Sequence, residues 1–407
     1  MGKGFFPLDE ELALLPGVLT PHGHECLVRL AGWMPFEKAV ELLEDFMGIR
    51  VGKGLSRRYT EAAGAAYAQM QTAEVERLEK EAPQAEQGAE KIQISADGAM
   101  VPLLHGVWAE VRTLVIGEVQ SAIEKNGEKV AHTCNLSYFS RKVNAEEFQR
   151  LALVEIHRRG VEKAQAVAAI MDGAEWEQGF TDYHCPQATR ILDFAHAAEH
   201  VNSIGEFLHG EHTPESQAWL SDHLHRLKLD GPDELLQELQ HLQPQYPEAE
   251  AIASNLAYLE KRKAQIQYPR FQAQGWPIGS GIVESGNKLV VEARLKGSGM
   301  HWAETQVNPM LAIRNIICSD RWKEEWPQIE ARLRQKTRLR QSQLHQSRIA
   351  APTTQPSSPM WIVDDKVIQS LSTRLEQENV PQKPKSNPWR KFKFGKALYQ
   401  RSYPPKK

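Results

Sequence analysis

The sequence predicts an α/β fold in which a mixed five-stranded sheet carries a helical insertion and follows a helical region. Two observations lead to this prediction. Apolar runs with the period or length of strands recur between residues 91 and 192. From about 197 to 271 that pattern gives way to helical periodicity. The predicted parts are a helical region at 1–88, a sheet-containing core at 89–200 and 272–325, an all-helical insertion at 201–271, and a tail at 326–407.

Composition limits the class of protein. A length of 407 residues suggests two or three domains, and a hydrophobic content of 41% is enough for a sizeable core. No stretch approaches the ~20 apolar residues of a membrane span, and the first residues lack a secretory hydrophobic region. We therefore expect a cytoplasmic protein with no membrane partner. The four cysteines lie too far apart in sequence to indicate a disulfide framework or a paired zinc motif.

The helical region contains a candidate helix-turn-helix. Residues 35–48 form an amphipathic pattern, a glycine-containing turn follows at 49–54, and a second, basic helix is predicted to begin at about residue 55. In such a motif the start of the second helix enters the DNA groove. This places Ser56, Arg57 and Arg58 as candidate DNA-binding residues. The alternative is an ordinary helical hairpin with a solvated basic edge.

The core is expected to hold five strands. The run 91–97 alternates apolar and polar residues, and 108–117 with 130–139 are expected to form an antiparallel pair. A helix capped by Asn144 follows, then a strand at 166–171, a helix through Tyr183 and a strand at 188–192. Three antiparallel strands followed by two parallel crossovers give the order of the ribonuclease-H-like fold.

Acidic residues follow the predicted strands. Asp97, Asp172 and Asp193 each end an apolar run, and Glu284 lies where a helix is predicted to begin. Carboxylates suit hard divalent cations, and two such ions ~3.5–4 Å apart can activate an attacking oxygen and stabilise a leaving oxygen at a phosphodiester. We expect Asp97, Asp172 and Glu284 to be catalytic and to bind metal, with Asp97 bridging two ions. From the residues alone, Asp193 remains a rival of Asp172 for the second catalytic position. For any one of them, the alternative is a turn residue or an acid in the first turn of a helix.

Asp193 and His196 lie three residues apart after the last predicted strand. Three interpretations remain open from the residues alone. The pair could add a ligand to the metal site or support its ligands, it could be a structural hydrogen-bonded pair, or it could bind zinc together with His200.

The tail is basic and interleaved with aromatic residues. After Glu378 it contains Trp389, Phe392, Phe394 and Tyr399 among lysines and arginines. Such a composition can bind nucleic acid through phosphates and stacking, or it can be a partly disordered, solvated tail.

Taken together, these stretches resemble the DDE transposases of bacterial insertion sequences, specifically the ISKra group, which is related to Mutator-like elements. The stretches that carry the resemblance are 35–43, 95–99, 171–176, 191–196, 279–285 and 294–302.

The resemblance implies Asp97, Asp172 and Glu284 as the catalytic triad and places Asp193 and His196 on an accessory motif after the fifth strand. It also implies two Mg²⁺ or Mn²⁺ ions, DNA as partner, a homo-oligomer and a location at the nucleoid. Arg294, Lys296 and His301 would lie along the segment that leaves the site, where they could contact phosphates. Trp276 or Trp302 could stack on a base, although core packing is the simpler role for each.

The implied reaction is cleavage of a phosphodiester at the element's end, followed by attack of the freed 3′-hydroxyl on target DNA. Two rival functions remain. One is a DNA-binding protein whose catalytic site is idle, such as a repressor or a component of a larger DNA-targeting machine. The other is a ribonuclease-H-like nuclease without strand transfer.

Overall fold

The computed structural model describes residues 19–85, 87–125 and 128–350. Residues up to Leu344 belong to one compact unit, and the account below is of that unit. None of the helices in the described residues is both long and apolar enough to cross a membrane. The aromatic-rich part of the predicted tail, 351–407, lies outside the described residues.

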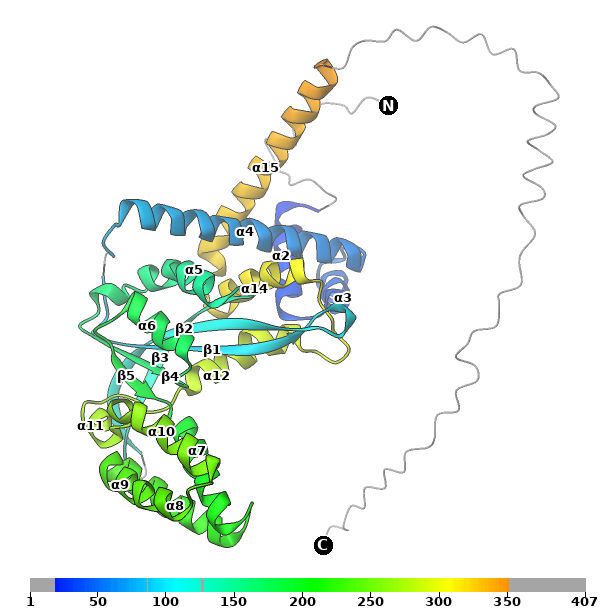
Figure 1. Ribbon diagram of the computed structural model, residues 1–407. Coiled ribbons are helices and arrows are strands. Elements are labelled where there is room, and N and C mark those ends of the chain that lie inside the picture. Colours follow the sequence, from blue (N-terminus) through cyan, green and yellow to red (C-terminus); the bar gives the residue numbers. More distant parts are fainter. Residues whose placement is uncertain (1–18, 86, 126–127, 351–407) are drawn as a thin grey trace, which may run out of the picture. The chain divides into compact units, whose positions relative to one another are not determined.

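A five-stranded mixed sheet forms the centre of the fold (Figure 1). Its order is β3-β2-β1-β4-β5, with β1, β2 and β3 antiparallel and with β4 and β5 parallel to β1. The predicted α/β class with a mixed five-stranded sheet is therefore confirmed. The strands are β1 (Lys91–Pro102), β2 (Trp108–Lys125), β3 (Glu128–Arg141), β4 (Ala166–Met171) and β5 (Thr189–Leu192).

The first strand is longer than expected. The sequence predicts its end at Asp97, but β1 continues through Gly98 to Pro102, and Asp97 pairs with Thr113 of β2. The reason is that Ala99 and Val101 are buried on the opposite face of the strand from Ile92, Ile94 and Ala96, so the antiparallel pairing with β2 extends past the glycine. Asp97 is thus a mid-strand residue.

Each face of the sheet is covered by helices (Figure 1). On one face, Ile92, Ile94 and Ala96 of β1 pack with residues of α4, α5 and α6. On the other, Ala99 and Val101 pack with the helical stretch from α12 to α14. The period of two in β1 therefore divides its side chains between two cores. The helices concerned are α4 (Lys53–Glu81), α5 (Ala145–Arg158), α6 (Glu175–His184), α12 (Gly281–Gly286), α13 (Ala293–Leu295) and α14 (Glu304–Cys318).

Helices also fill the interval between β5 and α12, as expected for 201–271. They form a core of their own, which includes Leu235, Leu239 and Ile252 and reaches Ile191 and Leu192 of β5. The helices are α7 (Phe194–His209), α8 (Pro214–Leu229), α9 (Pro232–Leu242), α10 (Glu250–Lys261) and α11 (Tyr268–Ala273). Short 3₁₀ turns lie at Leu104–Gly106, Val161–Lys163, Gln243–Gln245 and Lys263–Gln265.

The N-terminal helices are α2 (Pro21–Trp33), α3 (Phe36–Met47) and α4. Thr20 caps α2 by accepting the Gly23 N–H at 3.2 Å, and Gly48 ends α3 in the left-handed conformation at φ 66°. A short turn then leads into α4, so the two helices predicted for the helix-turn-helix are present. The second of them begins at Lys53 and runs unbroken for 29 residues.

The stretch predicted as one helix from about Val283 to Lys296 consists of α12, a π-helical segment at Asn287–Glu292, and α13. Segments of this kind are frequent at functional sites. The last helix is α15 (Trp322–Ala350). The predicted tail boundary at residue 326 falls inside α15, and it needs correction because Trp326, Ile329 and Leu333 are buried against α4 and α14.

A buried histidine in α2 gives a prediction about pH. The His24 ring lies 4.2 Å from the Tyr59 ring and 5.8 Å from the Trp326 ring, and neither of its nitrogens has a hydrogen-bond partner among the described residues. Burial lowers the pKa of His24 to about 4. A lowered histidine pKa means that the unfolded chain binds the proton more readily, so the stabilisation present above pH 6.5 is lost as the pH falls towards 4.

The expected size is about 2 kcal/mol of unfolding free energy lost by the wild type between pH 7.5 and 5 on account of this group. His24→Phe keeps an aromatic ring and is expected to lack this component. Urea denaturation of both proteins at the two pH values measures it. An equal loss in both would show that His24 does not carry the effect.

Candidate metal centre

Three carboxyl groups come together beside the C-terminal end of β4: those of Asp97, Asp172 and Glu177. One oxygen from each can be chosen so that all three lie within 4.8 Å of one another. The sheet register brings the two aspartates together. Ile94 of β1 pairs with Ala169 of β4, and three residues further along each chain come Asp97 and Asp172. Glu177 joins them from the first turns of α6.

Neighbouring groups hold Asp97 in place. One oxygen of Asp97 accepts the Gly98 N–H at 2.6 Å, and the other accepts the Asn287 side-chain amide at 2.8 Å. Asn287 begins the π-helical segment that follows α12. The central acid of the group is therefore tied both to its own strand and to the helical stretch on one face of the sheet.

Residues of the helical insertion hold the turn that follows β4 in place. Asp172 accepts the Ala174 N–H at 2.7 Å through its side chain, and its backbone carbonyl accepts the Tyr258 hydroxyl at 2.6 Å. Arg262 donates to the carbonyl of Gly173, and Gly173 itself has a φ of 87°, which favours glycine. Two residues at the C-terminal end of α10 thus fix the backbone that presents Asp172.

Glu177 is the most deeply buried of the three acids. Its side chain is fully buried, and one oxygen accepts the Gly173 N–H at 3.1 Å. The other oxygen, Oε1, has no hydrogen-bond donor beside it in the described part of the chain. A buried carboxyl oxygen without a partner is costly. It therefore offers a coordination position.

The electrostatics of the group also favour a cation. Burial raises the pKa of Glu177 to about 10, and a hydrogen bond with the Asp172 carboxyl and the charges of Asp172 and Asp97 add to the shift. Burial likewise raises the pKa of Asp97, although the Gly98 N–H and the Asn287 amide oppose the change. Without a cation, Glu177 therefore keeps its proton at neutral pH. A divalent ion would replace that proton, and three oxygen donors suit Mg²⁺ or Mn²⁺. The residues present thus fit a hard divalent cation.

Glu284 does not belong to this group of three. It lies exposed on α12, one helical turn before Asn287, whose amide contacts Asp97. The predicted role of Glu284 as a metal ligand and catalytic acid stays a prediction. The structure offers Glu177 as a carboxylate beside both aspartates.

Glu177 was missed by sequence reasoning, although a signal exists. It lies five residues after Asp172, at the start of a helix that directly follows a strand. An acid in the first turn of a helix is common and usually favourable for the helix dipole, so this position carries no distinctive pattern.

Asp193 and His196 form a pair beside the acidic group. Asp193 caps α7, accepts the His196 N–H at 3.2 Å and accepts the Ser280 N–H at 2.6 Å. Burial alone would raise the pKa of Asp193, but the bonds from His196 and Ser280 together lower it. Asp193 in turn raises the pKa of His196 to about 8. The pair therefore provides a positive imidazole near Asp172 at neutral pH.

The zinc alternative gains no support. His200 places Nδ1 2.6 Å from the Asn255 side-chain oxygen and stacks on Tyr258 with ring centroids 3.7 Å apart. Among the described residues, Asp193, His196 and His200 do not come close enough to form a three-ligand group.

The candidate DNA-binding residues differ in how far their side chains are exposed to solvent. Arg57 and Arg58 are exposed at the start of α4, and His301 is exposed after α13. Lys296 is half-buried and pairs with Glu292 at 2.6 Å. Two predictions need correction because the side chains are buried: Ser56 packs inside the N-terminal helices, and Arg294 donates through Nε to the carbonyl of Ala31 at 2.8 Å. Trp276 and Trp302 are also buried.

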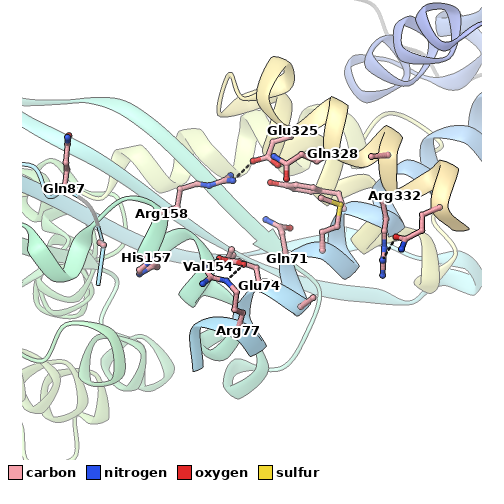
Figure 2. A pocket seen from close by; sticks show the side chains of 16 residues that line it. Gln71, Glu74, Arg77, Gln87, Val154, His157, Arg158, Glu325, Gln328 and Arg332 are labelled. Carbon is pink, nitrogen blue, oxygen red and sulfur yellow. Dashed lines mark hydrogen bonds and ion pairs between the residues drawn. The ribbon is translucent and has the colours of Figure 1, made fainter. Parts of the chain in front are cut away.

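A large cavity of about 1380 Å³ lies between α4, α5 and α15, and Figure 2 shows the side chains that line it. Two arginines of its lining are paired with acids that also line it. Arg158 contacts Glu325 at 2.5 Å, and Arg77 contacts Glu74 at 2.7 Å. None of the three clustered acids lines this cavity. We therefore assign it no part in the metal centre.

Comparison with protein-family models and with curated proteins finds no match for this sequence.

The contact from Tyr258 to Asp172 gives a prediction for metal affinity. Tyr258→Phe removes the hydroxyl that holds the Asp172 carbonyl, and support of this kind is worth about tenfold in metal affinity. We expect about tenfold weaker Mn²⁺ binding, measured by calorimetry. The matched control is Tyr183→Phe, since Tyr183 is exposed on α6 and is expected to leave the affinity unchanged. Equal affinities in wild type and Tyr258→Phe would contradict the prediction.

Proposed function

We propose that this chain is a metal-dependent DNA transposase with a ribonuclease-H-like catalytic core. The observation that carries the proposal is the register that sets Asp97 of the central strand beside Asp172 of its parallel neighbour, with Glu177 completing a three-carboxylate group. The strand order is the one expected for this fold. The sequence resembles DDE transposases, and we take the reaction proposed for the three carboxylates from that resemblance.

In the proposed mechanism, Asp97, Asp172 and Glu177 hold the metal. When bound, a pair of divalent ions supplies an activated attacking oxygen and stabilises the leaving oxygen. Glu284 is exposed on the neighbouring helix and is free to approach DNA or a second ion. The positive charge of His196, sustained by Asp193, favours a phosphate beside the acids. Arg57 and Arg58 at the start of α4 would position duplex DNA through its backbone.

The reaction has two steps. Water attacks a phosphodiester at the element's end, the P–O bond to the 3′ oxygen breaks, and that oxygen leaves as a 3′-hydroxyl. The 3′-hydroxyl then attacks a phosphodiester in target DNA, and one new P–O bond replaces one old bond. Binding two DNA ends at once would require a homo-oligomer. The protein would then work at the nucleoid.

The test uses a supercoiled plasmid that carries the coding sequence with its native flanking DNA, with Mg²⁺ or Mn²⁺ present. We expect nicks at defined flanking positions with 3′-hydroxyl ends, together with joined products. Asp97→Asn should bind the same DNA without cutting it. Cutting without joined products would replace the proposal with a nuclease that lacks strand transfer.

A DNA-binding protein with an idle core is the second candidate. The observation in its favour is that the acidic group does not include Glu284, which the resemblance implies as the third catalytic acid. In the plasmid experiment, binding by the wild type without any metal-dependent cutting would support this candidate and overturn the transposase proposal.

A further inference from the structure

The last helix, α15, changes its charge along its length. Its first nine residues, 322–330, carry three acids and one lysine, whereas the next ten, 331–340, carry five cations and no acid. The five are Arg332, Arg334, Lys336, Arg338 and Arg340. Because the whole chain has a net charge of −3, this stretch is a local concentration of positive charge and not the reflection of a basic protein.

The charge changes where the helix leaves the core. The apolar residues that pack α15 onto the protein lie on one face of the helix and are Trp322, Trp326, Ile329 and Leu333. The next positions on that face, 336, 337 and 340, hold no apolar residue. Beyond Leu333, α15 therefore stands clear of the other helices (Figure 1), and the side chains of Lys336 and Arg338 are exposed.

Part of this charge is left without a counter-ion. Arg334 pairs with Glu330 at 2.5 Å, but Lys336 and Arg338 have no carboxylate within ion-pair distance in the described part of the chain. Like charges four residues apart on a helix repel each other, and Arg334 with Arg338 has that spacing. An anionic partner would offset the repulsion.

The composition of this stretch indicates which kind of anion fits it. Leu339 is the only apolar residue between 334 and 343. A helix that lies on a membrane needs an apolar face, and the centre of a protein–protein interface is apolar or aromatic. A row of exposed arginine and lysine side chains suits instead the backbone of a nucleic acid, where phosphates repeat at short intervals.

The position of the stretch suits a duplex that also meets the start of α4. Leu333 packs in the same core as Tyr67 of α4, and Arg57 precedes Tyr67 by ten residues along that unbroken helix. At 1.5 Å per residue the separation along α4 is about 15 Å. One turn of duplex DNA spans ~34 Å, so a single duplex is long enough to contact both places.

We propose that residues 332–340 of α15 form a second contact surface for duplex DNA, which binds the phosphate backbone and extends the contact made by the start of α4. The proposal rests on the proposed function for the choice of DNA among nucleic acids. Phosphates are the same at every base pair, so this surface raises affinity and fixes the orientation of the duplex without reading its sequence.

The test compares two double variants with the same change in net charge. Lys336→Gln with Arg338→Gln removes two cations from the proposed surface, and Lys80→Gln with Lys323→Gln removes two exposed cations elsewhere. Fluorescence anisotropy with a mixed-sequence duplex of two helical turns, without metal, measures affinity over a series of salt concentrations. Each phosphate contact contributes ~0.9 to the slope of log affinity against log salt concentration, so we expect the slope to fall by about 1.8 in the first variant and by less than ~0.5 in the second.

Two results would overturn the α15 surface alone: an unchanged slope in the first variant, or an equal fall in both variants. Metal-dependent nicking in the plasmid experiment would stand in either case, because the anisotropy assay contains no metal and does not depend on the acidic group. Binding of the wild type to phosphatidylserine vesicles in preference to the duplex would assign the surface to lipid and overturn the proposal. Failure of the wild type to bind the duplex at low salt would remove the DNA premise of the proposed function together with this surface.

Discussion

Glu177→Gln is expected to weaken Mn²⁺ binding at least tenfold. Glu177 supplies a buried oxygen without a partner, and the amide of Gln offers a neutral donor in place of a carboxylate. Because Glu177 has a pKa of about 10 in the metal-free protein, Mn²⁺ binding at pH 7 must displace its proton. Calorimetry in buffers of different ionisation enthalpy should show proton release in the wild type and less of it in the variant.

Glu284→Gln is the matched comparison, since it makes the same chemical change at an exposed position on α12. Without DNA, we expect its Mn²⁺ affinity to stay within twofold of the wild type. The reverse result, with a loss in Glu284→Gln and none in Glu177→Gln, would return the third ligand position to Glu284. We expect the metal-free Glu177→Gln protein to fold as the wild type does. A pKa of about 10 keeps the Glu177 side chain neutral at pH 7, and Gln can still accept from the Gly173 N–H. A loss of metal binding in this variant would therefore not come from misfolding.

Gly64→Ala is expected to lower the free energy of unfolding by about 3 kcal/mol. Gly64 lies in α4 where the helix backbone meets α14, and a Cβ there would lie 1.9 Å from the carbonyl oxygen of Pro309 and 2.5 Å from its carbon. The clash is with backbone, so no side chain can rotate to relieve it. Relief would require the two helices to separate and would loosen the packing of the N-terminal helices on the core. Urea denaturation measures the change.

Gly179→Ala provides the opposite expectation in the same protein. Gly179 lies within α6, and a Cβ there meets nothing within 4 Å. The alanine should therefore stabilise the helix by ~0.5–1 kcal/mol through backbone entropy alone. Destabilisation of similar size in both variants would show that the close approach of α4 and α14 is not what makes Gly64 necessary.

The chain's order of elements could be read from its sequence because each element has its own local signal. The alternation at 91–97, the apolar run at 166–171 and the cap at Asn144 correspond to β1, β4 and α5. The meeting of Asp97 and Asp172 also followed from sequence, since the order of the elements predicts β1 and β4 as parallel neighbours, and the two aspartates follow their paired segments at the same offset. Their placement needed only the strand order and an approximate register.

The tertiary structure decided which other side chains join them and which reach the surface. Glu177 has the same local pattern as any first-turn acid, and only the packing of α6 turns it towards the aspartates. Ser56 and Arg294 lie in basic stretches that look exposed in sequence, yet both are buried, and Arg294 donates to the carbonyl of Ala31 in α2. Burial and proximity between residues far apart in the chain depend on the sum of many weak packing contacts, and no local pattern of residues records that sum.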